Sequence, residues 1–140
     1  MNQYFEQMVL GASPIELIRL LYQRGIRSVR EAREHLAAGR IAERSAAITN
    51  AYAVIDELMS ALKPEEAPEL AQRLSALYCY IEERLLAANL QQSDAPLAEV
   101  LGLMTTLSEA WAPLPEPVKV PAAWMTPELG KESERVAFSG

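Results

Sequence analysis

Residues 12–22 read Ala-Ser-Pro-Ile-Glu-Leu-Ile-Arg-Leu-Leu-Tyr, and this stretch carries almost every signal of a helix start. The Ser13 hydroxyl can accept a hydrogen bond from a free backbone N–H, and Pro14 fits the first helical position, where no donor is needed. Glu16 lies three residues after Ser13, so it can close a capping box and favour the positive end of the helix. The sequence therefore predicts that a rigid helix begins at Pro14.

A short apolar arm, residues 1–12, precedes this helix. Its large apolar residues are Tyr4, Phe5, Met8, Val9 and Leu10. A segment of this length is too short to form a stable helix alone, because nucleation of a helix is costly. We therefore expect an arm that hinges at Gly11 on the rigid helix.

Apolar residues recur at alternating intervals of three and four residues through most of the chain, which predicts amphipathic helices. The first stripe follows Pro14, and Gly39 is a plausible stop for that helix. Lys63-Pro64 ends the second helix, and Ser93 and Asp94 offer caps for the fourth. The predicted helices cover about 14–38, 40–62, 68–92 and 95–112.

Four stripes joined by short turns favour an all-α fold, an antiparallel four-helix bundle. The first stripe contains Ile18, Tyr22, Gly25, Val29, Ala32 and Leu36, and the second Ile41, Ile48, Tyr52, Ile55, Met59 and Leu62. The third contains Leu70, Leu74, Leu77, Ile81, Leu85 and Ala88, and the fourth Leu97, Val100, Met104, Leu107 and Trp111.

The C-terminal residues 113–140 differ from the bundle domain, which we place at 1–112. Five prolines between Pro113 and Pro127 predict an extended or partly disordered tail rather than a helix. Trp124 and Met125 lie within the tail, and they are expected either to fold back onto apolar surface or to contact another partner.

The composition limits the classes of partner and compartment. The net charge of −6 makes nucleic acid an unexpected partner. A lone cysteine, Cys79, allows no internal disulfide and is natural in a reducing compartment. The chain has no basic, apolar leader of signal length and no run of roughly 20 apolar residues, so we expect a cytoplasmic protein without membrane insertion.

The residues offer little for catalysis, metal or cofactor chemistry. With His35 as the lone histidine, the two Glu-x-x-His pairs of a di-iron bundle cannot be built. Cys79 and His35 form a dyad only if the fold brings them together, and the scattered glycines form no phosphate loop. The sequence therefore predicts no enzyme, no metal and no cofactor.

The sequence leaves two alternative functions open. Histidine phosphotransfer domains are helical bundles of similar size with a phosphorylated, exposed helical histidine, and they carry a His-x-x-Lys-Gly pattern. Here His35 is followed by Leu-Ala-Ala-Gly-Arg and lies in the last turn of its helix, where it also favours the helix dipole. The other alternative is a bundle that self-associates through its apolar face. The expected oligomeric state is a monomer or a weak homodimer.

The helices carry more apolar residues than a four-helix core needs, which suggests a groove for a partner helix or an extended peptide. This second apolar set contains Leu17, Leu20, Leu21, Ala51, Val54, Leu58, Leu86, Leu90, Leu101 and Leu103.

Two blocks of residues resemble a known family. The first block is Tyr4…Val9-x-x-Ala12-Ser13-Pro14-x-x-Leu17-Ile18-x-x-Leu21-Tyr22-x-x-x-Ile26. The second is Leu74-x-x-Leu77-Tyr78-x-Tyr80-Ile81-x-x-Arg84-Leu85-x-x-Ala88-Asn89, with Val54-Ile55-Asp56-Glu57-Leu58 between the blocks and Leu107-x-x-x-Trp111 after them. This pattern resembles the flagellin export chaperone family, FliS. Gly11 stands where Thr is usual, Cys79 stands where Asp is usual, and the tail extends past the usual end.

The resemblance implies a four-helix bundle that binds the disordered C-terminal segment of newly made flagellin. Such chaperones prevent premature polymerisation and assist delivery to the flagellar type III export gate, and without cargo the arm can lie over part of the same apolar surface. It implies partner contacts in the arm at Tyr4, Met8 and Leu10. The groove or its floor would contain Leu17, Leu21, Tyr22, Ile48, Tyr52, Ile55 and Tyr78, although Tyr22 and Tyr78 are equally expected as core residues.

Overall fold

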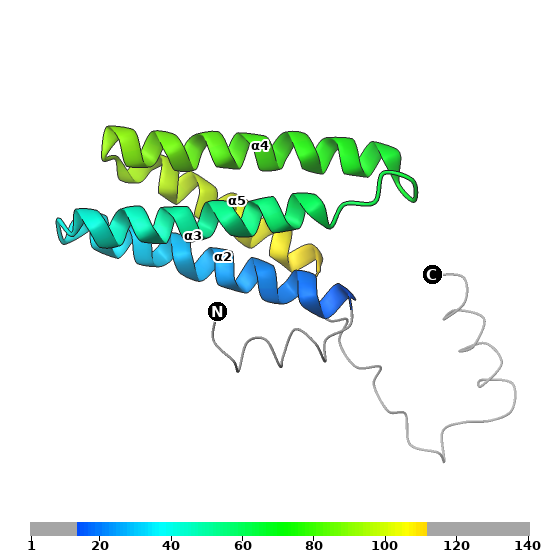
Figure 1. The fold of residues 1–140 in the computed structure, drawn as a ribbon, viewed down its shortest axis with the longest axis horizontal. Coiled ribbons are helices and arrows are strands. Elements are labelled where there is room, and N and C mark those ends of the chain that lie inside the picture. Colours follow the sequence, from blue (N-terminus) through cyan, green and yellow to red (C-terminus); the bar gives the residue numbers. More distant parts are fainter. Residues whose placement is uncertain (1–13, 112–140) are drawn as a thin grey trace, which may run out of the picture.

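The computed structural model describes residues 14–111, which form four α-helices and no strand within that range (Figure 1). The helices are α2 (Pro14–Ala37), α3 (Ile41–Ser60), α4 (Pro68–Gln91) and α5 (Asp94–Ala110). This confirms the predicted all-α four-helix bundle. The predicted arm and tail lie outside the described residues.

The helices form a closed ring in chain order. α2 packs against α3 and α5, and α4 packs against the same two helices from the other side, so α2 and α4 lie diagonally opposite. The start of α2, the loop between α3 and α4, and the end of α5 all lie at one end of the bundle (Figure 1). We call this end the pocket end.

Helix boundaries follow the predicted signals with small differences. Gly39, two residues after the end of α2, has a φ of +72°, which is the left-handed conformation that glycine adopts without strain. α3 ends earlier than Lys63-Pro64 predicted, at Ser60. α5 begins at Asp94 rather than 95, and Ser93 makes no side-chain capping bond.

Asp94 has another role that the sequence did not reveal. Arg33 of α2 donates two hydrogen bonds to its carboxylate, at 2.8 Å and 3.0 Å, and this ion pair lowers the pKa of Asp94. The first turn of α5 is therefore joined to α2. Because both side chains are substantially exposed, the pair sets orientation more than stability.

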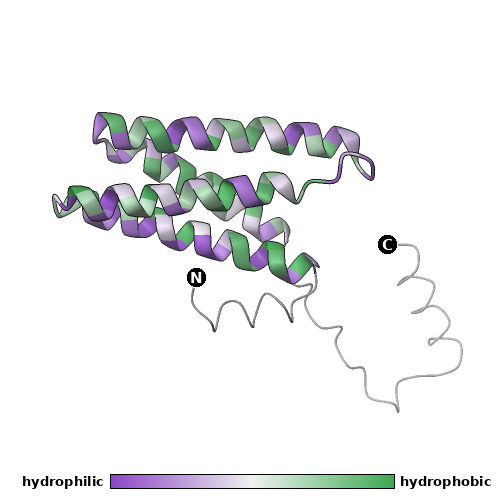
Figure 2. Ribbon diagram, viewed as in Figure 1, coloured by the Kyte–Doolittle hydropathy of each residue, from purple (hydrophilic) through white to green (hydrophobic). Residues whose placement is uncertain are grey.

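The core confirms three of the predicted stripes in outline and corrects the second. On α3 the buried face runs through Ala47, Ala51, Val54 and Leu58 as well as Ile48 and Ile55. Ala51 and Val54, interpreted as surplus groove residues, are therefore core residues, whereas Leu58 is buried and also lines the pocket described below. Ile41, predicted to face the core, is 59% exposed. Figure 2 shows the resulting mixture of hydrophobic and hydrophilic positions along each helix.

Gly25 allows α2 to approach both of its neighbours closely. A Cβ atom at this position would lie 2.5 Å from Met104 Cε of α5 and 3.1 Å from Val54 Cγ1 of α3. Met104 is fully buried and Val54 nearly so, which leaves both side chains little room to move. The absent side chain at Gly25 therefore sets the spacing of three helices.

We predict that Gly25→Val lowers the free energy of unfolding by about 1–3 kcal/mol, because the added side chain overpacks this contact. Gly102→Val is the matched control, since a Cβ there meets nothing within 4 Å and the change in helix propensity is the same. Urea denaturation measures both variants. Equal effects at the two positions would contradict the packing role of Gly25.

Candidate binding site

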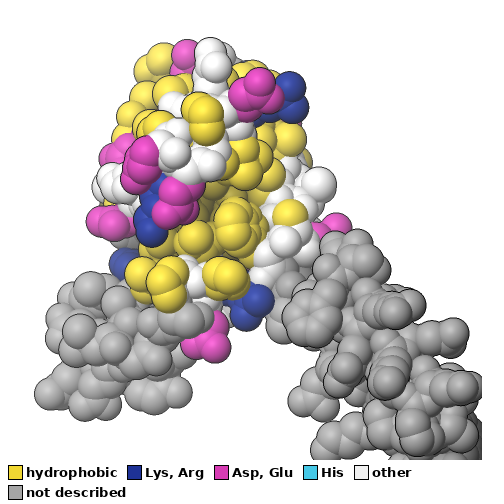
Figure 3. Space-filling view, turned by 90° about the vertical axis from the view of Figure 1, so that its right-hand side faces the viewer, with side chains coloured by type: hydrophobic (Ala, Val, Ile, Leu, Met, Phe, Trp, Pro, Cys, Tyr) yellow, Lys and Arg dark blue, Asp and Glu magenta, His cyan; other side chains and the backbone are white. Residues whose placement is uncertain are grey.

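An apolar pocket of about 400 Å³ opens at the pocket end of the bundle. Figure 3 faces this end and shows hydrophobic side chains gathered in a hollow, with charged side chains at its margin. All four helices or their flanking residues contribute to it. The lining residues are Pro14, Ile15, Leu17, Ile18, Leu21, Leu58, Ala61, Leu62, Lys63, Glu66, Ala67, Leu70, Ala71, Leu74, Tyr78 and Trp111.

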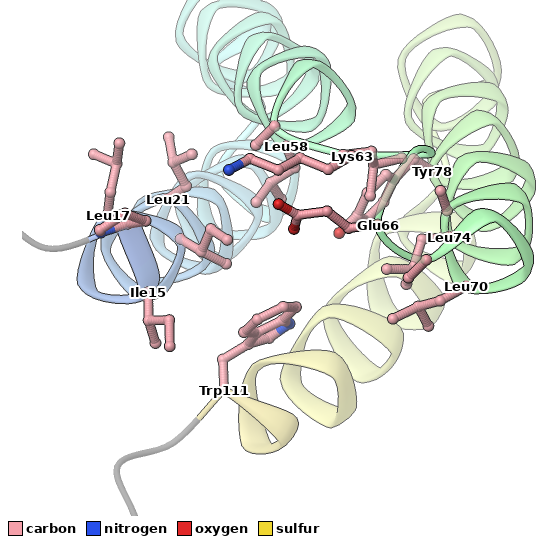
Figure 4. Close-up of a pocket in the computed structure, with 16 residues that line it drawn as sticks. Ile15, Leu17, Leu21, Leu58, Lys63, Glu66, Leu70, Leu74, Tyr78 and Trp111 are labelled. Carbon is pink, nitrogen blue, oxygen red and sulfur yellow. The ribbon is translucent and has the colours of Figure 1, made fainter.

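The mouth of the pocket lies between the diagonal helices α2 and α4. Ile15 is 51% exposed and Leu70 is 54% exposed, so large apolar side chains face solvent on both sides. The Trp111 indole projects into the opening between them (Figure 4). Exposed apolar surface gathered in a hollow, with a polar margin, is typical of a site for a protein or peptide partner.

The floor of the pocket includes Tyr78, which is paired with a second buried tyrosine beneath it. Tyr78 of α4 lines the pocket, and its hydroxyl lies 2.6 Å from the hydroxyl of Tyr22 of α2, so the pair shares one hydrogen bond. Both residues are almost wholly buried. Burial raises the pKa of each phenol above its ordinary value of 10, so both hydroxyls stay protonated at neutral pH.

Trp111 is held at the mouth by two contacts to α2. The Arg19 guanidinium donates from Nε to the Trp111 carbonyl oxygen. The Trp111 indole, which can only donate, lies beside the Tyr22 hydroxyl. These contacts tie the end of α5 to α2, and they connect the rim of the pocket with its floor.

The charged residues of the pocket lie in the loop between α3 and α4. Lys63 and Glu66 are the charged side chains among its lining residues, and both are exposed. One charge of each sign leaves the pocket nearly neutral. The arrangement therefore favours an apolar occupant with few charges rather than an ionic ligand.

A second polar cluster lies between α3 and α4, away from the pocket lining. Glu82 is 9% exposed, and its Oε2 atom has no hydrogen-bond partner among the described residues. Tyr52 is a hydrogen-bond partner of this carboxyl group, and Asp56 lies close by. Burial, with Asp56 as the next cause, raises the pKa of Glu82 from 4.5 to about 7.

On the opposite side of α4, an exposed cluster joins α4 to α5. Arg84 Nε donates to Glu99 Oε1 at 2.6 Å, and the Tyr80 hydroxyl donates to Glu99 Oε2 at 2.7 Å. These two donors lower the pKa of Glu99, and the carboxylate raises the pKa of Tyr80. Each donor has one acceptor oxygen, so the cluster is a satisfied surface contact.

The structure brings three of the sequence-predicted residues together in the pocket, namely Leu17, Leu21 and Tyr78. Tyr22, Ile48 and Ile55 are core residues, so they lie beneath the surface. Tyr52 is half-buried beside Glu82. Tyr4, Met8 and Leu10 lie outside the described residues.

Several pocket residues were predicted as core rather than as binding residues. Leu70, Leu74 and Trp111 belong to the predicted stripes, but they occupy the first turns of α4 and the end of α5. At the end of a bundle no further layer of side chains covers such positions. Their positions near helix ends were the sequence signal that could have predicted their exposure in the pocket.

The residues considered for catalysis do not form a reactive group. Cys79 is exposed on α4, whereas His35 is in the last turn of α2, and its Nδ1 accepts a hydrogen bond from Arg40 Nε at 3.1 Å. His35 is half-buried, and its hydrogen bond with Arg40 is exposed. Within residues 14–111 no three histidine, cysteine or acidic side chains are grouped to hold a metal.

Membrane insertion was also considered from the sequence. Among the helices that the structure describes, none combines the length and the apolar character needed to cross a bilayer.

Comparison with known proteins is decisive for the family. The model of the family described as flagellar protein FliS matches residues 1–117. The chain belongs to the FliS family. The match covers the arm and the whole described bundle, and residues 118–140 lie beyond it.

Curated FliS relatives agree with this match. The flagellar secretion chaperone FliS of Salmonella typhimurium is 36% identical over 107 residues, which are 76% of this chain and 79% of the relative. FliSB of Pseudomonas aeruginosa is 35% identical over 115 residues, 79% of this chain and 91% of the relative. FliS of Bacillus subtilis is 30% identical over 108 residues, 77% and 80% of the two chains. This chain is thus a member of a family of flagellar secretion chaperones.

We predict that the costs of replacing Tyr22 and Tyr78 are not additive, because the two hydroxyls share one hydrogen bond. Tyr22→Phe leaves the Tyr78 hydroxyl buried without its partner, at a cost of about 1–3 kcal/mol in the free energy of unfolding. Tyr78→Phe should cost less, because Tyr22 still lies beside Trp111. The double variant should cost less than the sum of the two. Additive costs in a double-mutant cycle would contradict a direct Tyr22–Tyr78 bond.

We also predict that Glu82 makes stability depend on pH. Its raised pKa means that the folded chain binds more protons than the unfolded chain between pH 4.5 and about 7, so stability falls as the pH rises through that range. Glu82→Gln should remove this slope and raise the free energy of unfolding at pH 8 by about 1–2 kcal/mol. Glu83→Gln, on the exposed neighbour, is the control. The same dependence of stability on pH in the wild type and in Glu82→Gln would contradict the assignment of this dependence to Glu82.

Proposed function

We propose that this chain binds the disordered C-terminal segment of flagellin in the cytoplasm, prevents its premature polymerisation and assists its delivery to the flagellar type III export gate. The observation that carries the proposal is the open apolar pocket at the end of the bundle. Leu17 and Leu21, which line it, lie in the sequence block that carries the FliS resemblance.

The chemistry of the pocket suits a disordered segment. Such a segment offers apolar side chains at intervals along an extended backbone, and apolar contacts need little directional alignment. A segment that orders on binding can bury on the order of 1,000–3,000 Å² while losing several kcal/mol to its own ordering. The chaperone can therefore hold a large surface and still release it at the export gate.

The predicted contact residues fall into two groups, one half-buried and one buried. The half-buried Leu17, Leu21 and Tyr52 are able to touch the segment directly. The buried Tyr22, Ile48 and Ile55 act from beneath by keeping the surface rigid, and the buried Tyr78 forms part of the pocket lining. We further propose that Tyr4, Met8 and Leu10 of the arm compete for the same apolar surface and are displaced by cargo.

Isothermal titration calorimetry of the full chain with a peptide of the flagellin C-terminal segment tests this proposal. We expect micromolar or tighter binding. Leu17→Glu should weaken it by at least about tenfold, because a carboxylate would be left without a partner in apolar surroundings.

Gln23→Glu is the matched control for that variant, since it adds the same charge at an exposed site of α2 outside the pocket lining. It should bind as the wild type does. An absence of binding at micromolar concentration would overturn the proposed function. An equal loss of peptide affinity in Leu17→Glu and Gln23→Glu would show that charge, and not the pocket, controls the affinity.

A further inference from the structure

We infer that the pocket at the end of the bundle is the docking site for this chain's own C-terminal segment, with Trp124 and Met125 as the side chains that enter it. This inference goes beyond the proposed function, and its test needs no cargo. It rests on the pocket, on the point where the described chain ends, and on the residues that follow.

The pocket has the size and chemistry for such an occupant. Its volume of about 400 Å³ lies within the range of roughly 300–1,000 Å³ that is usual for sites that enclose compact apolar groups. A tryptophan side chain buries about 150–250 Å² when it is enclosed, which makes it an effective apolar anchor. Ile15 and Leu70 at the mouth would lose much of their exposure beneath it.

The segment starts at the site that it would fill. Trp111 lines the pocket and is the last described residue, so the chain leaves the bundle at the mouth. Residues 112–123 then separate it from Trp124, and at about 3.1 Å per residue in an extended Pro-rich chain they reach up to about 37 Å. The interval 118–120 contains no proline and allows the chain to turn back.

Charge favours this tail over the N-terminal arm as the occupant. Lys63 and Glu66 line the pocket, one charge of each sign (Figure 4). Lys119 and Glu128 flank the Trp124-Met125 pair with one charge of each sign, so both pocket charges can find an opposite partner. The arm has Glu6 as its one charged side chain. Such exposed pairs add little affinity, but they distinguish between occupants.

The docking segment is an addition to the family pattern. The FliS match ends at residue 117, so Trp124 and Met125 lie beyond it. A docked tail would cover Leu17 and Leu21 at the pocket. If these residues also bind cargo, a consequence that rests on the proposed function, the tail and the cargo would exclude each other at this end of the bundle.

Paramagnetic NMR on the full chain tests the inference. Cys79 is replaced by Ser, and a nitroxide is attached at Gln72→Cys, an exposed position beside the pocket residue Ala71. We expect the label to broaden the indole N–H signal of Trp124 and that of Trp111. A label at Gln91→Cys, about 28 Å further along α4 at 1.5 Å per residue, should leave both signals sharp.

A pair of leucine variants shows whether the pocket itself holds the tail. Leu70 and Leu86 are almost equally exposed on α4, at 54% and 56%, but Leu70 alone of the two lines the pocket. Leu70→Glu should restore the Trp124 signal in the Gln72-labelled chain, because it places a charge at the apolar mouth. Leu86→Glu should leave the signal broadened.

Two results would overturn the inference. One is a sharp Trp124 signal in the Gln72-labelled chain while the Trp111 signal is broadened, because the tail would then be absent from the pocket. The other is broadening of Trp124 that appears when a separate labelled chain is mixed with an isotope-enriched, unlabelled one, because the tail would then enter a second copy.

Discussion

The hydrogen bond between the Tyr22 and Tyr78 hydroxyls separates the closed core of this bundle from its open end. It joins α2 and α4, the two helices that lie diagonally opposite, at a distance of 2.6 Å between the oxygens. Water cannot take the place of either hydroxyl as a hydrogen-bond partner, because both residues are almost wholly buried. Beneath the pair, Gly25 lets the helices pack tightly. Beyond it, the same four helices present apolar side chains that no other part of residues 14–111 covers, and the pocket results.

This division explains why the sequence predicted the fold better than the site. The alternating intervals located all four helices within a few residues, because the periodicity of an amphipathic helix depends on local sequence alone. The buried face of α3 was misjudged because Ala47 and Ala51 are small and gave a weak signal beside the larger Ile41, which faces solvent. Whether Tyr22 and Tyr78 form core or groove depended on their partner across the bundle, and no spacing within one helix reveals that partner.

The pocket residues also show that spacing within one helix does not distinguish core residues from surface residues. Leu70 and Leu74 have the periodicity of core residues, and they would be core residues in a longer bundle. They line the pocket because α4 begins at Pro68 and nothing described lies beyond them. A secretion chaperone has use for such a site, because apolar contacts at an open end can hold an unfolded segment without demanding a fixed geometry. Protonated tyrosines at the floor add no charge that would oppose an apolar occupant.

The central claim is that flagellin binds at the pocket end of the bundle. Leucine methyl NMR of the full chain, titrated with a flagellin C-terminal peptide, tests it most directly because leucines lie both inside and outside the pocket. The account predicts shifts at Leu17, Leu21 and Leu74, which line the pocket. Leu86 and Leu90, exposed on α4 outside the pocket lining, should shift much less. Shifts confined to Leu86 and Leu90, or no shifts at saturating peptide, would contradict it.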